Sequence, residues 1–100
     1  QRKMCIRDSP KMLQAYGALG AAAAEGNVLD AKTRELIALA VAVTTRCESC
    51  IGVHADEAVK AGATEEEVAA ALAMSIALNA GAAYTYSLRA LEAYNAQKGE

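Results

Sequence analysis

The sequence is poor in aromatic side chains: among 100 residues it has no tryptophan, no phenylalanine and four tyrosines. Hydrophobic residues nevertheless make up 54% of the chain, and alanine and small aliphatic residues supply most of them. This composition suits closely packed helices, and it exceeds what the modest core of one domain of this size can hide. We therefore expect part of the apolar surface to be buried between the subunits of a homo-oligomer.

An excess of charge of either sign is also missing, because the net charge is −2 and no cluster of basic residues is present. Nucleic acid and anionic membrane surfaces require such a basic patch, so we expect neither as a partner. The most apolar stretch, Val68–Tyr86, is rich in alanine and is interrupted by Ser75, Asn79 and Gly81. Its marginal length and weak hydrophobicity argue against a membrane span.

The first charged residues are not followed by the hydrophobic segment of a signal peptide. The three cysteines are odd in number, and Cys47 and Cys50 form a CxxC pair. In a chain without a signal peptide, this pattern favours redox chemistry or metal binding in the cytosol over a structural disulfide. We therefore expect a cytoplasmic protein.

Residues 1–9 differ from the remainder, because they are dense in charge and follow no period. We interpret this segment as a disordered or non-native arm, and Cys5 within it as incidental. Residues 10–100 contain no internal repeat and no linker rich in glycine and proline, which indicates a single domain.

Apolar residues recur at helical spacing through the domain, which predicts an all-α bundle of about five helices. The expected helices run from Pro10 to a stop at Glu25-Gly26-Asn27, from Lys32 to Thr44, from about Arg46 to Ala61, from Thr64 to about Asn79, and from a break at Ala80-Gly81 to near Asn95.

Local signals mark several of these helices. Ser9, Asp30 and Thr64 are the expected N-caps, and Thr64 forms a capping box with Glu67. Residues 36–43 are apolar all round, so we expect the second helix to be buried on every side. In the first helix, two glycines at positions 17 and 20 either weaken it or let a neighbour approach closely.

Two of the three cysteines and the only histidine lie close together in the third predicted helix. Cys47, Cys50 and His54 are spaced by three and four residues, so they lie on one helix face. Thr45 and Glu48 fit a capping box, which places both cysteines in the first turn. There, free backbone N–H groups and the positive end of the helix dipole favour a thiolate.

The helix terminus alone is too weak to activate a thiol. Lowering the reference thiol pKa of about 8.5 by two units corresponds to about 2.7 kcal/mol, whereas a helix N-terminus supplies about 0.3 to 1 kcal/mol. His54, one turn after Cys50, is the available base. Its proximity favours Cys50 as the attacking thiol, whereas the helix dipole alone favours Cys47. A sulfenic acid at either cysteine is able to close to a Cys47–Cys50 disulfide.

Glu35 is a further candidate, twelve residues before Cys47 in the second predicted helix. In an antiparallel hairpin that turns near Thr45, the helical rise places the Glu35 carboxylate nearer to the imidazole than to the thiols. We expect a separation that suits a water-bridged relay from Glu35 through His54 to Cys50.

Other interpretations remain open. A buried CxxC pair is compatible with two small hydrophobic residues in a core. A zinc site is a sharper alternative, because Cys47, Cys50 and His54 are three potential ligands and Cys5 is a spare thiol. The alternative from a different class is a non-enzymatic helical oligomerisation module with a redox- or zinc-responsive CxxC pair. It differs from an enzyme in that turnover does not depend on both cysteines.

One motif resembles the signature of the alkyl hydroperoxidase D (AhpD)-like group within the carboxymuconolactone decarboxylase family. It consists of Glu35, a gap of eleven residues, Cys47-Glu48-Ser49-Cys50, a gap of three residues, and His54. The stretches 29–40 and 61–68 are also similar to that group, and the resemblance covers roughly Asn27 to Ala96. It implies an all-α AhpD-like bundle that assembles into homotrimers or homohexamers.

The resemblance also implies a set of roles. Cys50 corresponds to the peroxidatic cysteine, Cys47 to the resolving cysteine, and Glu35 with His54 to the proton relay. The implied activity is a thiol-dependent peroxidase of the peroxiredoxin type, or a disulfide oxidoreductase, with a hydroperoxide as substrate. A dithiol such as a lipoyl group or a thioredoxin-like protein supplies electrons, and neither a bound cofactor nor a metal is required. The decarboxylases of the family generally lack the CxxC pair, which argues against that activity here.

Overall fold

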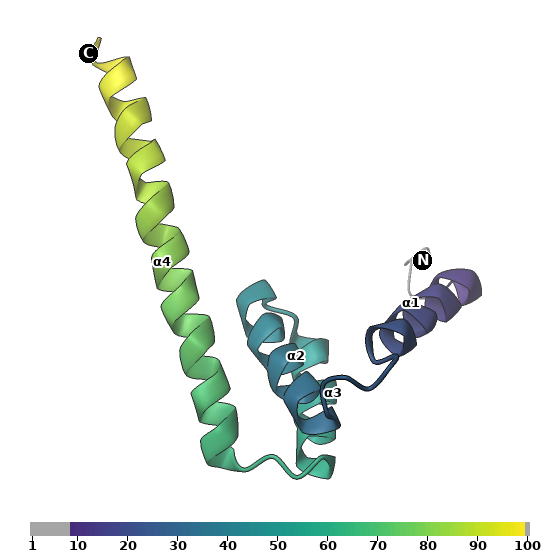
Figure 1. The fold of residues 1–100 in the computed structure, drawn as a ribbon. Coiled ribbons are helices and arrows are strands. Elements are labelled where there is room, and N and C mark those ends of the chain that lie inside the picture. Colours follow the sequence, from purple (N-terminus) through teal and green to yellow (C-terminus); the bar gives the residue numbers. More distant parts are fainter. Residues whose placement is uncertain (1–8, 100) are drawn as a thin grey trace.

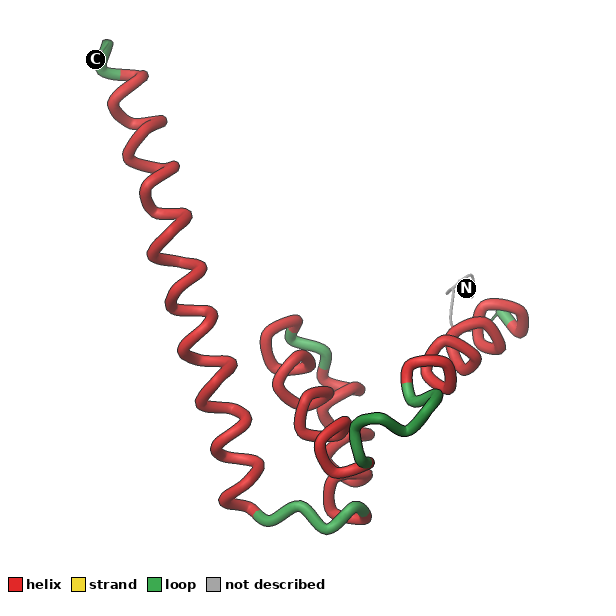
Figure 2. Tube along the Cα trace, in the orientation of Figure 1, coloured by secondary structure: helices red, strands yellow, loops and turns green. Residues whose placement is uncertain are grey.

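In the computed structural model, the described residues 9–99 form four α-helices and no strand (Figures 1 and 2). These helices are α1 Pro10–Ala23, α2 Ala31–Thr45, α3 Glu48–Lys60 and α4 Glu65–Gln97. The all-α prediction is therefore confirmed, but the number of helices is four instead of about five. The predicted arm and its Cys5 lie outside the described residues, apart from Ser9, which caps α1.

The predicted break at Ala80-Gly81 is wrong, because α4 runs without interruption through both residues. A glycine inside a helix costs only about 1 kcal/mol relative to alanine, and the flanking residues are rich in strong helix formers. Gly81 does not adopt the positive φ of a helix-ending glycine. A single glycine is therefore insufficient to end this helix.

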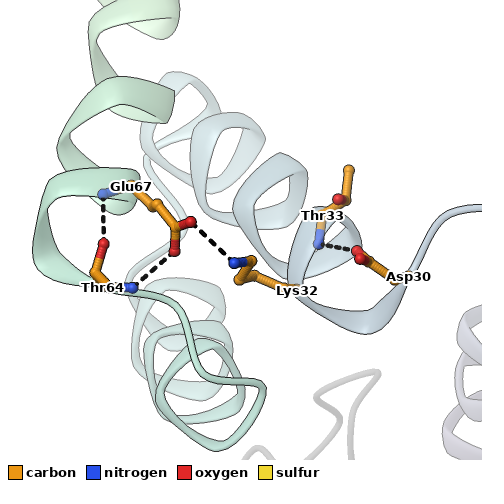
Figure 3. Close-up of polar contacts among 5 residues, drawn as sticks. All are labelled: Asp30, Lys32, Thr33, Thr64 and Glu67. Carbon is orange, nitrogen blue, oxygen red and sulfur yellow. Dashed lines mark hydrogen bonds and ion pairs between the residues drawn. The ribbon is translucent and has the colours of Figure 1, made fainter.

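Three predicted N-caps are present. The Ser9 hydroxyl accepts a hydrogen bond from the Met12 N–H, and the Asp30 carboxylate accepts one from the Thr33 N–H. At the start of α4, the Thr64 hydroxyl accepts from the Glu67 N–H at 3.1 Å, and Glu67 Oε1 accepts from the Thr64 N–H at 2.9 Å (Figure 3). Each cap is a contact over three residues, which is why sequence spacing predicted it.

The predicted capping box at the start of α3 is wrong. Thr45 is the last residue of α2, and its hydroxyl donates a hydrogen bond to the Val41 carbonyl. Cys47 is the N-cap instead, and its Sγ accepts a hydrogen bond from the Cys50 N–H at 3.3 Å. The physical reason is Arg46, which closes α2 in the left-handed conformation and turns the chain directly into α3.

Arg46 has a φ of 57°, which is unfavourable for a residue with a Cβ atom by about 1 to 2 kcal/mol. We expect Arg46→Gly to raise the free energy of unfolding by about 1 kcal/mol, since glycine adopts this conformation readily. Urea unfolding at one protein concentration measures the change. Arg46→Ala removes the same charge but keeps the Cβ atom, so an equal gain in that control would rule out backbone strain as the cause.

The helix α2 is central, because it packs against both α3 and α4. At the start of α4, Lys32 Nζ lies 2.9 Å from Glu67 Oε2 (Figure 3). This hydrogen bond from Lys32 lowers the pKa of the Glu67 carboxyl, with the Thr64 N–H as a further cause. About two turns further along the same interface, the buried Ser75 hydroxyl donates to the Ala40 carbonyl at 2.9 Å. These two contacts fix the position of α4 along the axis of α2.

The helix α2 is not buried on every side within one chain, contrary to the sequence prediction. Leu39 and Ala42 are buried, but Ile37, Val41 and Val43 remain between 39% and 53% exposed. The reason is that only α3 and α4 pack against α2, and two neighbours leave part of its surface open.

The chain as a whole is extended, with α1 and the distal part of α4 projecting from the remainder (Figure 1). Its radius of gyration is 18.7 Å, against about 13 Å for a compact domain of this length. Its accessible surface is 7942 Å², against roughly 5,400 Å² expected for a folded monomer of this mass. Much apolar surface is therefore left uncovered by the chain itself.

By length and composition alone, α4 qualifies as a membrane-spanning helix. Its most apolar window of 18 residues has a mean hydropathy of 1.4, and 6% of that window is buried. One such helix is weak evidence for a span, since helices that are covered by other subunits have the same features.

Candidate active site

The two motif cysteines meet at the start of α3, where they form a Cys47–Cys50 disulfide with a Cα–Cα distance of 5.2 Å. Cys47 is the N-cap and Cys50 is the third residue of the helix. Both side chains are partly covered. The structure therefore places the sulfur atoms at the end of α3 that carries the free backbone N–H groups and the positive dipole.

Ser49, between the two cysteines, was not singled out by the sequence analysis. Its hydroxyl lies 3.7 Å from Cys47 Sγ, so this sulfur has both the Ser49 hydroxyl and the Cys50 N–H as neighbours. Two polar donors beside one sulfur favour negative charge on it. Cys47 is consequently suited to leave as a thiolate when the disulfide is reduced.

Glu35 and His54 are in direct contact across the α2–α3 interface. Glu35 Oε1 lies 2.6 Å from His54 Nδ1, and the two side chains are 20% and 33% exposed, respectively. The prediction of a water molecule between these two side chains is therefore wrong. The sequence argument considered only the rise along each helix, whereas both side chains also extend across the interface towards each other.

This contact determines which ring nitrogen of His54 is available. An ionised carboxylate only accepts hydrogen bonds, so His54 Nδ1 is assigned the proton and donates it to Glu35. In the neutral imidazole, Nε2 then carries the lone pair. Because His54 follows Cys50 by four residues, the ring and Cys50 share one face of α3.

Cys50 and His54 open into a cleft of about 500 Å³ between α3 and α1. The helix α3 contributes Ser49 and Val53 as well, and α1 contributes Tyr16, Gly17, Leu19, Gly20 and Ala23. Cys47 does not line this cleft. The geometry therefore brings Cys50 and His54 to a space that a ligand can enter, with Glu35 on the far side of the imidazole.

The contribution of α1 was missed by the sequence analysis. Nothing in the local pattern connects residues 16–23 to the cysteines, which lie more than twenty positions later. The available signal was the pair Gly17 and Gly20, which repeat on one face of a helix that they weaken.

A metal-binding group of three or more His, Cys, Asp or Glu side chains does not occur among residues 9–99. The three zinc ligands considered from the sequence are engaged elsewhere: Cys47 and Cys50 with each other, and His54 Nδ1 with Glu35. The described part of the chain thus gives the zinc interpretation no support.

Comparison with known proteins connects the chain to a family. The profile of the carboxymuconolactone decarboxylase family matches residues 10–93. A crystal structure of a protein from Methanobacterium thermoautotrophicum, a Northeast Structural Genomics Consortium target, is similar with a TM-score of 0.74 and 30% identity. That match covers 84% of this chain and 94% of the other.

Curated relatives are similar over most of their length. An uncharacterised protein of Haemophilus influenzae is 89% identical over 89 residues, which cover 89% of this chain and 79% of that protein. The uncharacterised protein 4 in the cox locus of Paracoccus denitrificans is 39% identical over 77 residues, or 77% and 69% of the two chains. These matches establish kinship and fold, and the names of these relatives specify no reaction.

Proposed function

The chain belongs to the carboxymuconolactone decarboxylase family, and from this we propose that it is a thiol-dependent peroxidase or disulfide oxidoreductase. One observation carries the proposal: Cys50 and His54 line the same cleft, while Cys47 and Glu35 contact them from outside it. In this proposal Cys50 is the nucleophile, His54 the base, and Glu35 and Cys47 are the group that orients the base and the resolving thiol.

In the proposed first half-reaction, His54 Nε2 accepts the proton of the Cys50 thiol. The Cys50 thiolate attacks one oxygen of a hydroperoxide ROOH, the O–O bond breaks, and the released alkoxide takes the proton from His54 to leave as ROH. Cys50 becomes a sulfenic acid, two electrons having passed from sulfur to the peroxide. Glu35, 2.6 Å from His54 Nδ1, stabilises the imidazolium that forms transiently.

In the second half-reaction, the Cys47 thiol attacks the Cys50 sulfenic acid, water leaves, and the Cys47–Cys50 disulfide forms. A dithiol donor, such as a lipoyl group or a thioredoxin-like protein, then reduces the disulfide by thiol exchange and becomes a disulfide itself. Attack of the donor on Cys50, the sulfur that lines the cleft, expels Cys47 beside the Ser49 hydroxyl. The net reaction converts ROOH and a dithiol into ROH, water and a disulfide.

We also propose that the protein acts as a homotrimer or homohexamer. The accessible surface exceeds that of a compact monomer by roughly 2,500 Å², which is of the order that stable subunit interfaces bury. Outside the cleft, uncovered apolar side chains include Ile37 on α2, Val59 on α3 and Leu88 on the distal part of α4, which are 47%, 74% and 52% exposed, respectively. Copies of the chain that pack on these faces would supply the core that one chain lacks.

The reaction is tested by peroxide titration of the reduced protein, read out by intact mass. A Cys5→Ser background removes the third thiol, so that all reaction arises at the CxxC pair. We expect the loss of two hydrogens per chain at one equivalent of peroxide, and the recovery of both upon addition of a dithiol. A reduced chain that is inert to peroxide would contradict the proposal and leave the helical oligomerisation module.

A further inference from the structure

The helix α1 contains two interior glycines, and no packing contact among the described residues explains their presence. Each costs about 0.8 to 1 kcal/mol relative to alanine in a helix. Interior glycines commonly permit a neighbouring backbone to approach. Here, however, a Cβ atom added at Gly17 or at Gly20 would meet no atom of residues 9–99 within 4 Å. Close packing against the described part of the chain is thus not the reason for either glycine.

Both glycines instead line the cleft that contains Cys50 and His54. They are three residues apart, which places them on one face of α1, opposite the N-terminal turns of α3. Their missing side chains keep open space directly across from the candidate nucleophile.

The chemistry of the cleft wall indicates what this space accepts. Tyr16, Leu19 and Val53 give it a largely apolar lining, and the polar groups lie on the α3 side, with Ser49, Cys50 and His54. The cleft volume of about 500 Å³ lies within the range of small-molecule sites, roughly 300 to 1,000 Å³. A hydrogen peroxide molecule is smaller than two waters, each of about 30 Å³, and needs far less room.

We propose that Gly17 and Gly20 are specificity-determining positions, which admit a bulky apolar substituent on the hydroperoxide that Cys50 reduces. The inference rests on the proposed peroxidase function and adds to it the part of the chain that selects the substrate. The reacting oxygens lie at Cys50 and His54, while the apolar substituent lies along the glycine face of α1. A long side chain at either glycine would extend into this space from α1 and reduce the room left for the substituent, while the reacting groups stay on α3.

The test compares turnover of cumene hydroperoxide with turnover of hydrogen peroxide, with dithiothreitol as the common reductant. Gly20→Leu is expected to lower kcat/KM for cumene hydroperoxide about 10-fold or more relative to hydrogen peroxide, since even one methylene in a pocket changes selectivity by about 10- to 200-fold. Gly20→Ala is expected to lie between the parent and Gly20→Leu.

The matched control is Ala21→Leu, which adds a similar side chain to the adjacent position of α1 that does not line the cleft. Leucine and alanine both form helices better than glycine, so we expect the glycine variants to fold, with circular dichroism as the check. The ratio of the two kcat/KM values is expected to stay at the parental value in Ala21→Leu.

Several outcomes would overturn the inference. An unchanged ratio in Gly20→Leu, or an equal loss for both peroxides, means that the glycines do not select by size. Dissociation of the oligomer in Gly20→Leu but not in Ala21→Leu, seen by sedimentation, means that the glycine face seats a second copy instead of a ligand. A parent protein that turns over neither peroxide contradicts the proposed function itself, which distinguishes that failure from a failure of the glycine assignment.

Discussion

Replacing Cys50 with serine is expected to abolish rapid reaction with hydroperoxides, with a loss of about 10³-fold or more in the second-order rate constant. The serine hydroxyl is a far weaker nucleophile at neutral pH, and Cys47 does not line the cleft that the peroxide enters. Stopped-flow measurement on the reduced protein in the Cys5→Ser background gives this constant.

Cys47→Ser is the matched variant, because it removes the other sulfur of the pair. We expect it to react with peroxide at nearly the parental rate, but only once, and to stop at a sulfenic acid that a dimedone adduct reveals by mass. If Cys47→Ser were the variant that lost the fast phase, then Cys47 would be the attacking thiol. This result would favour the helix dipole over proximity to His54 as the activating influence.

The second large effect is expected at His54. Loss of a positioned general base typically costs about 10²- to 10⁴-fold in rate, and we expect His54→Gln to fall in this range for kcat/KM with hydroperoxide. The ultraviolet absorbance of the thiolate in the reduced protein reports whether the loss arises from a smaller ionised fraction. A parental rate in His54→Gln, with the disulfide still forming, would remove the imidazole from the mechanism.

Glu35→Gln separates the orientation of His54 from the charge beside it. The glutamine side-chain oxygen is able to accept the same hydrogen bond from Nδ1, but it carries no negative charge. We therefore expect a smaller loss than in His54→Gln, and a larger loss in Glu35→Ala, which removes the acceptor as well. Equal rates for the parent and both variants would show that Glu35 contributes to packing between α2 and α3 alone.

Local features of this protein were predictable from the sequence, since they depend on residues within one helical turn. The caps at Ser9, Asp30 and Thr64 are contacts over three residues, and the common face of Cys50 and His54 follows from a spacing of four. The N-cap of α3 is the exception, because the sequence predicted a Thr45–Glu48 capping box there. The left-handed turn at Arg46 decided in favour of Cys47.

The sequence by itself thus determined the helical class, most of the helix ends and the presence of two thiols and an imidazole on one helix. Only the tertiary structure decided that Glu35 contacts His54 directly, that Cys50 but not Cys47 opens to the cleft, and that α1 supplies the opposite wall. The physical reason is the separation along the sequence between the residues that interact. Hydrogen bonds within a helix repeat with each turn, so residue spacing predicts them. Contacts between helices depend on how their apolar faces pack together, and the spacing of residues along the chain does not specify this packing.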